Sequence, residues 1–322
     1  MPETKNILSA DIGGTHSRFA HFTAGPGGEL ELVGVKWLKT TDARSFGGLL
    51  DDLRESGSSL KPEEADMVVI AIAGPIEGGT KSSPPFISWG IDLSNARQEH
   101  GFRRSSLIND FVAQAYACLT PAGKAAEEIL PGEAVPGAAV GVMGAGTGLG
   151  KAVLIRNGRG DYVALPSEGG HANFPFVSPQ ECQFQEFLLK ERGDKYITGN
   201  IVVSGKGLSY IHQFLNGERL EPREVAERIV EHPETLGWMS RFYGRACRNF
   251  VLEALTLGGL YIAGGVAARI PELVTGKDFE LEFRTSDTLA HLLNKVPVFL
   301  IKDENSGLWG GAFFGAQALK AA

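Results

Sequence analysis

Glycine is the feature that most restricts how this chain can fold. The sequence has 42 glycines among 322 residues, about twice the usual share of roughly 7%. They gather at the ends of apolar segments, as Gly13-Gly14, the run from Gly144 to Gly150, Gly169-Gly170, Gly258-Gly259, Gly264-Gly265 and Gly310-Gly311. Glycine at the end of a strand marks a sharp turn or a close backbone approach. Repeated glycine turns of this kind predict nests of backbone amides that hold phosphate.

Charge and composition exclude several classes of protein. Lys and Arg number 31 and Asp and Glu number 38, so the net charge is −7, which argues against nucleic acid or an anionic membrane as partner. No apolar run approaches the about 20 residues that span a bilayer. Residues 1–6 are polar and carry no apolar signal core. The three scattered cysteines, Cys118, Cys182 and Cys247, are predicted to be buried thiols, and we expect a cytoplasmic protein.

Short apolar segments alternate with amphipathic ones along the whole chain. The expected strands are 7–11, 17–22, 67–73, 106–109, 139–143, 151–156, 260–263 and 296–301. The expected helices are 111–119, 178–192, 222–231, 234–257 and 306–319, and the Pro-, Gly- and Glu-rich stretch 121–136 is expected to connect two domains. Two hairpins surround glycine turns, which suggests an internal duplication. The alternation predicts an α/β fold with mixed sheets.

Several well-known motifs are absent. The Gly150-Lys151 pair lacks the glycine and the hydroxyl residue that a Walker A loop requires. The run from Gly144 to Leu149 misses the third glycine of a dinucleotide fingerprint. No HExxH, GxSxG or HRD-type kinase loop occurs in the sequence.

Two glycine turns are the main candidates for phosphate binding. Asp11 ends an apolar strand and precedes Gly-Gly-Thr15, where backbone amides and the Thr15 hydroxyl can face one point. A carboxylate there needs a divalent cation to tolerate phosphate, so Asp11 is a candidate Mg²⁺ partner through water; the alternative is a hairpin turn with a satisfied Asp. The run from Gly144 to Gly150, with Thr147, is a second nest. Two nests suit a nucleotide held between two domains.

Polar residues at two further places are candidates for work on a hydroxyl-rich substrate. Asn109 and Asp110 follow a strand and precede a helix, at the edge where α/β proteins bind ligands. Asp110 is a candidate general base and Asn109 a hydroxyl ligand, although both residue types also cap helices. Glu168 and His171 flank a glycine pair and suit a polyol; the alternative is a plain surface loop.

The ordered set of motifs resembles the bacterial glucokinase family. The blocks are Asp11-Ile-Gly-Gly-Thr15, Ala71-Ile-Ala-Gly-Pro-Ile76, Ile108-Asn-Asp-Phe111, Gly144-Ala-Gly-Thr-Gly-Leu-Gly150, Glu168-Gly-Gly-His171, Ser204-Gly-Lys-Gly-Leu208 and Ile262-Ala-Gly-Gly265. The resemblance implies the hexokinase and actin-like ATPase superfamily. Its fold is two-domain and ribonuclease H-like, with mixed sheets, flanking helices and a central cleft. We expect a small α/β domain at 1–109 plus 306–322, and a large one with a helical half at 110–305.

The resemblance also implies a role for each matching residue. Asp110 would take the proton from the sugar C6 hydroxyl, while Asn109, Glu168 and His171 would hold other hydroxyls. The predicted phosphate ligands are Ala10, Asp11, Ile12, Gly13, Gly14, Thr15, Gly146 and Thr147, and Gly264 and Gly265 would lie near the adenosine. Asn200 stands where the family usually has a further sugar-binding Glu, and 85–89 lacks an Asn that often precedes Trp89.

The implied reaction is ATP-dependent phosphorylation of glucose to glucose 6-phosphate, with Mg²⁺ as cofactor. A homodimer through the helical second half is expected, with a hexose and ATP as the small-molecule partners. One alternative, motivated by Asn200, is a kinase of another hexose or of an N-acyl hexosamine. Another is a non-catalytic sugar sensor on the same fold, which the acidic charge and the intact Asp110 disfavour.

Overall fold

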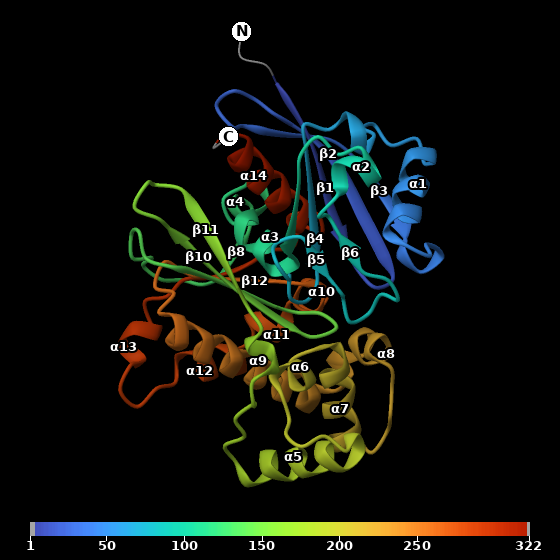
Figure 1. Cartoon of the computed structure of the whole chain (residues 1–322). Helices are drawn as coiled ribbons and strands as arrows, with labels where there is room; N and C mark the ends of the chain where they lie inside the picture. Colours follow the sequence, from blue (N-terminus) through green and yellow to red (C-terminus); the bar gives the residue numbers. More distant parts are fainter. Residues whose placement is uncertain (1–3, 321–322) are drawn as a thin grey trace. The chain divides into compact units, whose positions relative to one another are not determined.

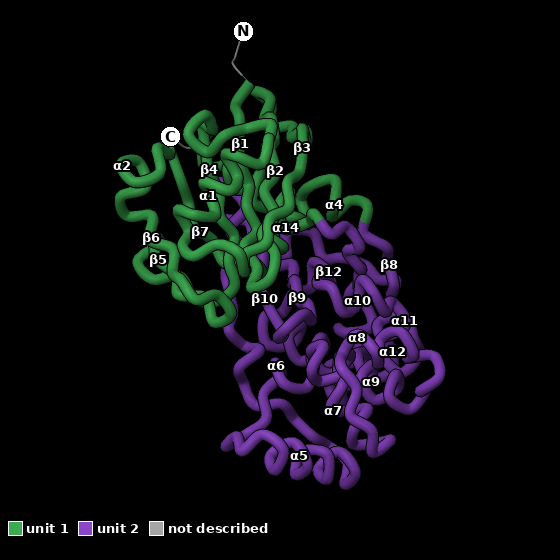
Figure 2. Tube along the Cα trace, turned by 90° about the vertical axis from the view of Figure 1, so that its right-hand side faces the viewer, with its two compact units in different colours: residues 1–125, 305–322 green, residues 126–304 purple. Residues whose placement is uncertain are grey.

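The computed structural model describes residues 4–320 of the chain, so parts of the predicted polar N-terminus and of the predicted domain ends lie outside the described residues. The chain divides into two compact units, residues 1–125 with 305–322, and residues 126–304 (Figure 2). The boundary between residues 125 and 126 falls inside the Pro-, Gly- and Glu-rich stretch 121–136, whereas the expected domain boundary lay between residues 109 and 110. Helix α3 (Asp110–Ala117) accounts for this, because it packs against α14 (Ser306–Lys320) of the first unit.

The first unit is built on a mixed sheet with the strand order β3-β2-β1-β4-β7. Its strands are β1 (Lys5–Ile12), β2 (His16–Ala24), β3 (Leu30–Lys39), β4 (Met67–Ile72) and β7 (Ser105–Asn109). The first three are antiparallel, and β4 and β7 continue parallel to β1. Every residue of β4 is buried, as expected for a strand covered on both faces. A separate small ladder joins β5 (Lys81–Ser82) and β6 (Ile91–Asp92).

Helices cover both sides of this sheet. Besides α3 and α14, the first unit contains the helices α1 (Phe46–Glu55), α2 (Ala96–His100) and α4 (Pro121–Lys124) and the 3₁₀ turns Thr40–Asp42 and Pro62–Glu64. Figure 1 shows α14, drawn in red, lying along the sheet, and it contacts β1 and β4. Gly311 allows this approach to the sheet, because a Cβ there would lie 2.3 Å from the Ser9 Oγ of β1, and Gly310 allows the approach to α3, because a Cβ there would lie 1.7 Å from the Ala113 carbonyl oxygen.

The second unit repeats the arrangement of the first sheet. Its order is β11-β10-β9-β12-β13-β8, with strands β8 (Glu127–Leu130), β9 (Val140–Ala145), β10 (Leu149–Arg156), β11 (Tyr162–Ser167), β12 (Leu260–Ala263) and β13 (Val298–Leu300). The first three strands in that order are antiparallel, and β12 and β13 run parallel to β9. This is the β3-to-β7 pattern again, with an added antiparallel β8. The duplication suggested by the two hairpins therefore extends to strand order and direction.

The rest of the second unit is helical, as the sequence predicts. Its helices are α5 (Pro179–Arg192), α6 (Gly199–Val202), α7 (Gly205–Asn216), α8 (Pro222–Glu227), α9 (Pro233–Ala254), α10 (Gly265–Arg269), α11 (Glu272–Thr275), α12 (Lys277–Arg284), α13 (Ala290–Leu293) and the 3₁₀ turns Gly169–His171 and Ile229–Glu231. The apolar face of α9 belongs to the core, since Met239, Phe242 and Tyr243 are fully buried. The cysteine prediction is wrong for Cys182, which is exposed on α5, whereas Cys247 is buried. Among residues 4–320, every helix is too short or too polar to cross a membrane.

Candidate functional site

The Gly13–Thr15 turn joins β1 to β2 in the first unit. The Gly13 N–H closes the turn by donating to the His16 carbonyl at 3.1 Å. Among the described residues, the N–H groups of Gly14 and Thr15 have no backbone partner. A side chain at Gly14 would meet the Phe86 Cβ at 2.9 Å, so the close approach of the loop at residue 86 requires glycine there. The turn therefore offers two free amides and the exposed Thr15 hydroxyl, as a phosphate nest requires.

Asp11 lies beside this nest and is held by an arginine. The register of the hairpin places Asp11 opposite Arg18, and Arg18 Nη2 donates to Asp11 Oδ2. The Arg18 guanidinium also lies over the Trp37 ring, 5.3 Å from its centroid. Both side chains of the pair keep about a fifth of their surface exposed, at 18% for Asp11 and 21% for Arg18. The carboxylate is thus neutralised without being sealed from solvent.

Asn109 and Asp110 lie at the junction of β7 and α3. The Asn109 Oδ1 accepts hydrogen bonds from the N–H groups of Phe111 at 2.9 Å and Val112 at 3.3 Å, and its Nδ2 donates to the Gly74 carbonyl at 3.2 Å. Asn109 is therefore the helix cap that the alternative interpretation describes. Asp110 is the first helical residue, and its Oδ1 accepts from the Phe111 N–H at 3.0 Å. A carboxylate is favoured at a helix N-terminus by the helix dipole.

The sheet brings these two parts of the first unit to one edge. Ile12, Ile72 and Asn109 are register partners across β1, β4 and β7. Because neighbouring strands lie about 4.8 Å apart, Asn109 is roughly 10 Å from the end of β1. Asp11, the 13–15 turn, Asn109 and Asp110 consequently share the carboxyl edge of parallel strands, where α/β sheets bind ligands.

The glycine turn of the second unit is also closed by a glycine N–H, although its closing bond spans two residues and that of the first turn spans three. It joins β9 to β10, and the Gly146 N–H closes it by donating to the Gly148 carbonyl at 2.8 Å. The N–H groups of Thr147 and Gly148 have no partner among residues 4–320. Gly146 and Thr147 are exposed. The Gly146 amide therefore does not face a ligand in this arrangement, and the next two amides form the nest.

Gly264 and Gly265 lie beside this second turn. Strand β12 pairs with β9 so that Ala263 is opposite Gly144. Gly264 follows with φ of +90°, and a Cβ there would lie 2.7 Å from the Ala145 carbonyl oxygen. Both the left-handed backbone and the close approach require glycine at this position. The predicted phosphate turn and the predicted adenosine contact are thus neighbours within the second unit.

Asn200 connects the second turn to the Glu168–His171 loop. Its Oδ1 accepts from the Leu149 N–H at 2.7 Å and lies 2.4 Å from where a Cβ of Gly170 would be. Its NH₂ group has no partner among the described residues. Asn200 therefore has a positioning contact that the sequence does not reveal, and it leaves a free donor.

Glu168 and His171 are solvent-accessible neighbours. The Glu168 Oε2 lies 3.7 Å from the His171 Nε2, and their side chains are 52% and 70% exposed. A 3₁₀ turn over Gly169–His171 holds them together, with the His171 N–H donating to the Glu168 carbonyl at 2.9 Å. One acceptor and one imidazole on the same exposed turn can bind adjacent hydroxyl groups.

The buried side chain of Lys151 packs against the Glu168–His171 loop. The sequence motifs do not predict Lys151 as a site residue. Its side chain is 7% exposed, its Nζ lies 3.9 Å from Glu253 Oε2, and it stands 5.4 Å from the Phe250 ring centroid. The Nζ also lies 3.4 Å from the position of a Gly169 Cβ. Burial lowers the pKa of Lys151, while the Glu253 carboxylate acts in the opposite direction. A lone lysine in the apolar segment 149–155 was the available signal.

Arg18 and Phe86 are two further residues that the sequence interpretation missed. Arg18 could have been found from the expected hairpin, because the pairing that brings residue 12 opposite residue 17 also brings Asp11 opposite Arg18. Phe86 has no such signal, since it reaches Gly14 from a loop more than 70 residues away. Its side chain is 60% exposed, which leaves an aromatic surface beside the first nest.

The metal prediction depends on Asp11 alone. Within residues 4–320, no three His, Cys, Asp or Glu side chains gather into a metal-binding group. Mg²⁺ is commonly held by one or two carboxylates together with waters and substrate phosphates. A single accessible carboxylate beside a phosphate nest fits that pattern, provided that the ion replaces or shares the contact with Arg18.

Comparison with solved structures defines the class of protein. The glucokinase of an Antarctic psychrotroph has a TM-score of 0.82 and 27% identity, covering 97% of this chain and 99% of that one. A ROK-family glucokinase from Streptomyces griseus, solved with glucose and AMPPNP, shares the fold at a TM-score of 0.62 and 18% identity, covering 97% and 99% of the two chains. The fold is that of glucokinases and ROK sugar kinases with the actin-like ATPase fold.

Sequence comparison specifies the family. Residues 8–318 match the sequence model of the glucokinase family. The glucokinase of Pectobacterium atrosepticum is 31% identical over 330 residues, which cover 99% of each chain, and that of Nostoc punctiforme is 30% identical, covering 97% of this chain and 99% of the relative. This chain belongs to the glucokinase family. The predicted family, fold class and enzyme class are thereby confirmed.

Proposed function

We propose that the chain transfers the terminal phosphoryl group of ATP to the C6 hydroxyl of glucose. The observation that carries this proposal is the match to the glucokinase family over residues 8–318, together with an intact Asp110 at the carboxyl edge of the first sheet. The sugar oxygen attacks the γ-phosphorus, the bond from that phosphorus to ADP breaks, and the hydroxyl proton passes to the Asp110 carboxylate. Positioning and charge neutralisation supply most of the acceleration in such transfers.

The two nests have a common task in this proposal. The amides of Gly14 and Thr15 in the first unit, and of Thr147 and Gly148 in the second, bind phosphate oxygens of one nucleotide. Gly264 and Gly265 allow the adenosine to approach the backbone. Bound beside Asp11, Mg²⁺ would screen the phosphate charge. Asp11 would orient the ion, and Arg18 would neutralise Asp11 when the ion is absent.

Sugar hydroxyls have four partners in this proposal. Asn109 retains its second amide hydrogen after donating to Gly74, while Glu168 and His171 provide an acceptor and an imidazole. At Asn200 the carbonyl oxygen already binds the Leu149 N–H, so its free NH₂ can only donate. A donor therefore replaces the family's carboxylate acceptor at this position.

Replacement of Asp110 tests the proposed reaction. Asp110→Asn keeps an oxygen that can accept from the Phe111 N–H, so the start of α3 is retained. We expect kcat with glucose and ATP to fall by about 10²–10⁴, the usual contribution of a general base, with glucose affinity and the far-ultraviolet circular dichroism spectrum unchanged. Turnover within twofold of the unaltered protein would contradict the assignment of Asp110.

A kinase of another hexose or of an N-acyl hexosamine is the second candidate, favoured by the donor at Asn200. An ADP-release assay over glucose, mannose, fructose and N-acetyl hexosamines distinguishes the two. A higher kcat/KM for any sugar other than glucose would replace glucose as the substrate. Glucose binding without ADP release from any donor would instead indicate a sugar sensor.

Cytoplasmic location and a homodimer complete the proposal. Use of ATP and three free cysteines are typical of a reducing compartment where ATP is available. The family resemblance is the basis for the homodimer, in which the helical half of the second unit would form the interface. Sedimentation equilibrium at micromolar protein tests it, with a single species of about 34.4 kDa as the contradicting result.

A further inference from the structure

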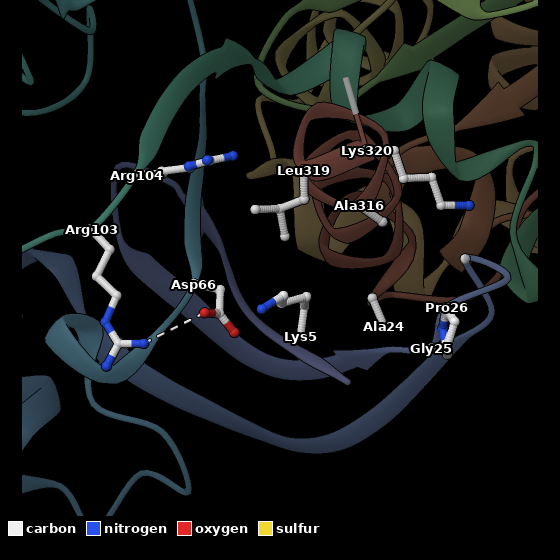
Figure 3. Close-up of a pocket in the computed structure, with 11 residues that line it drawn as sticks. Lys5, Ala24, Gly25, Pro26, Asp66, Arg103, Arg104, Ala316, Leu319 and Lys320 are labelled. Carbon is white, nitrogen blue, oxygen red and sulfur yellow. Dashed lines mark hydrogen bonds and ion pairs between the residues drawn. The ribbon is translucent and has the colours of Figure 1, made fainter. Parts of the chain in front are cut away.

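A cavity of about 350 Å³ lies within the first unit and contains none of the predicted site residues. It is bounded by the start of β1, the turn after β2, the segment before β7 and the end of α14 (Figure 3). The volume is at the lower end of the range for small-molecule sites. Its lining residues are Lys5, Ala24, Gly25, Pro26, Gly28, Asp66, Arg103, Arg104, Ala316, Leu319 and Lys320.

The charge of this cavity is opposite to that of the whole chain. Four of the lining residues are cationic and only Asp66 is anionic, although the protein carries a net charge of −7. The cations come from three distant parts of the sequence, at residues 5, 103–104 and 320. Convergence of separate segments on one cavity is not explained by a local run of basic residues.

The existing contacts neutralise only part of this positive charge. Asp66 accepts from the Asn6 N–H at 2.9 Å and lies 3.5 Å from Arg103 Nη1. The Lys320 Nζ donates to the Gly27 carbonyl at 2.8 Å, which fixes its position, and it forms no ion pair with another residue of 4–320. Asp66 is thus paired with Arg103, and neither Arg104 nor Lys320 has a carboxylate partner within residues 4–320.

Arg104 is the group most available to a ligand. Its residue is exposed, and its guanidinium has no partner among the described residues. Figure 3 shows it reaching toward Leu319 across the cavity. A guanidinium presents paired N–H donors that match the oxygens of phosphate and carboxylate groups.

We propose that this cavity binds a small organic oxyanion with at least two negative charges. The anionic group binds Arg104 and Lys320, and the carbon skeleton lies against the apolar surface of Ala24, Ala316 and Leu319. Phosphate and carboxylate share the chemistry that the guanidinium recognises, so the ligand is a phosphate ester or a polycarboxylate. The site is separate from the sugar and nucleotide contacts proposed above and does not depend on them.

Methyl NMR with inorganic phosphate and citrate as probes tests the site at constant ionic strength. We expect saturable shifts of the Ala24, Ala316 and Leu319 methyl signals. Binding of either probe at the predicted nucleotide turns would shift other methyl groups, such as Ala10 or Ala145, so the two locations are resolved. Tighter binding of phosphate identifies phosphate esters as the class, and tighter binding of citrate identifies polycarboxylates. If neither probe shifts the three cavity methyls, the proposal is overturned.

A matched pair of variants separates a specific site from general charge attraction. Arg104→Gln is expected to weaken binding by about tenfold, the effect of losing one charge-assisted hydrogen bond. Arg97→Gln removes the same charge from exposed α2 in the same unit and is expected to leave the affinity within twofold. Equal weakening by both variants would overturn the proposal. Arg104→Lys keeps the positive charge and loses the paired N–H donors of the guanidinium. Its affinity should lie between those of the unaltered protein and Arg104→Gln.

Discussion

Gly14 and Gly146 are glycine for different physical reasons. A Cβ at Gly14 would lie 2.9 Å from the Phe86 Cβ, so the folded protein itself needs glycine there. At Gly146 no atom lies within 4 Å of the Cβ position, and its φ is not positive. The folded chain alone gives no reason for glycine at residue 146. Close approach of a ligand to the 146–148 turn is the remaining reason, in agreement with the proposed phosphate contact.

Gly146→Ala therefore separates stability from nucleotide binding. The melting temperature is expected to be unchanged or slightly higher, because alanine at a compatible position reduces the entropy of the unfolded chain. The KM for ATP is expected to rise by at least about tenfold, while the KM for glucose changes little. Calorimetry and steady-state kinetics on the same preparation check both. A normal KM for ATP would show that the nucleotide does not approach this turn.

The His212 and His232 rings form a buried contact between α7 and the start of α9. Their centroids are 4.5 Å apart at 76°, and His212 is fully buried. The His212 Nδ1 lies within hydrogen-bond distance of Asn216 and Thr235, while its Nε2 has no partner within residues 4–320. Burial, with a smaller contribution from neighbouring His232, lowers the pKa of His212 below its ordinary 6.5.

This arrangement predicts a loss of stability on acidification. The unfolded chain takes up a proton at residue 212 at a higher pH than the folded chain does, so the free energy of unfolding falls as the pH drops below 6.5. One such proton contributes a slope of at most about 1.4 kcal/mol per pH unit. Urea unfolding at pH 8, 7, 6 and 5 measures it. His212→Gln should flatten the profile, whereas His291→Gln, at an exposed position on α13, should not; identical profiles for the two variants would exclude this origin.

Among the elements, three helices of the second unit are joined by one buried arginine. Arg245 of α9 is 1% exposed. It donates to both oxygens of Glu181 on α5, at 2.6 and 3.0 Å, and to Glu282 on α12 at 2.8 Å. Its Nη1 also donates to the Pro175 carbonyl at 3.0 Å. Although burial acts to raise it, the bonds from Arg245 and from backbone amides hold the pKa of Glu181 below its usual range.

Arg245→Met is expected to lower the free energy of unfolding by about 3–5 kcal/mol, because it leaves the Glu181 carboxylate without its buried partner, whereas Glu282 keeps Arg248. Urea denaturation followed by circular dichroism measures this change. Arg223 provides the matched control, since its pair with Glu227 on α8 is exposed and Arg223→Met should have little effect. Similar midpoints for the two variants would show that the buried network contributes no net stability.

Local signals predicted elements well where a short segment determines the outcome. Helix α5 lies where the sequence predicts a helix at 178–192: Ser178 caps it by accepting from the Glu181 N–H at 3.1 Å, and Gly193 ends it with φ of +70°. The Glu181 side chain also accepts from the Val177 N–H and pairs with Arg245, and the local sequence does not show the second of these contacts. Strand β3 was missed, since none of its residues is fully buried and its apolar pattern is weak.

For the candidate site, the motifs were predictable and their contacts were not. Each glycine turn is visible as a run of residues, and the capping role of Asn109 was one of the two interpretations considered. The Asn200–Leu149 bond and the approach of Phe86 to Gly14 join segments that are far apart in sequence. Such contacts depend on the complete fold, which a residue pattern does not encode. The contacts of Asn200 with the turns at Gly148 and Gly170 can be seen only in the three-dimensional structure.

At the scale of the whole molecule, the two units repeat one design. In each sheet an antiparallel hairpin carries the glycine turn, and two parallel strands follow the first strand of that hairpin. In each turn a glycine N–H closes the loop, and the next two amides have no backbone partner in the part of the chain that the structure describes. The proposed function assigns the phosphates of one nucleotide to both nests. If this assignment is correct, nucleotide binding should change the radius of gyration of the protein.

Small-angle scattering tests this consequence. With glucose and a non-hydrolysable ATP analogue present together, we expect a smaller radius of gyration than for the free protein, because phosphates that bind amides of both units draw the units together and exclude water from the transfer. Gly146→Ala should need a higher analogue concentration to reach the same compaction, in proportion to its KM for ATP. The free and the doubly liganded protein would scatter alike if the nucleotide were held by one unit alone, and the shared role of the two turns would then be refuted.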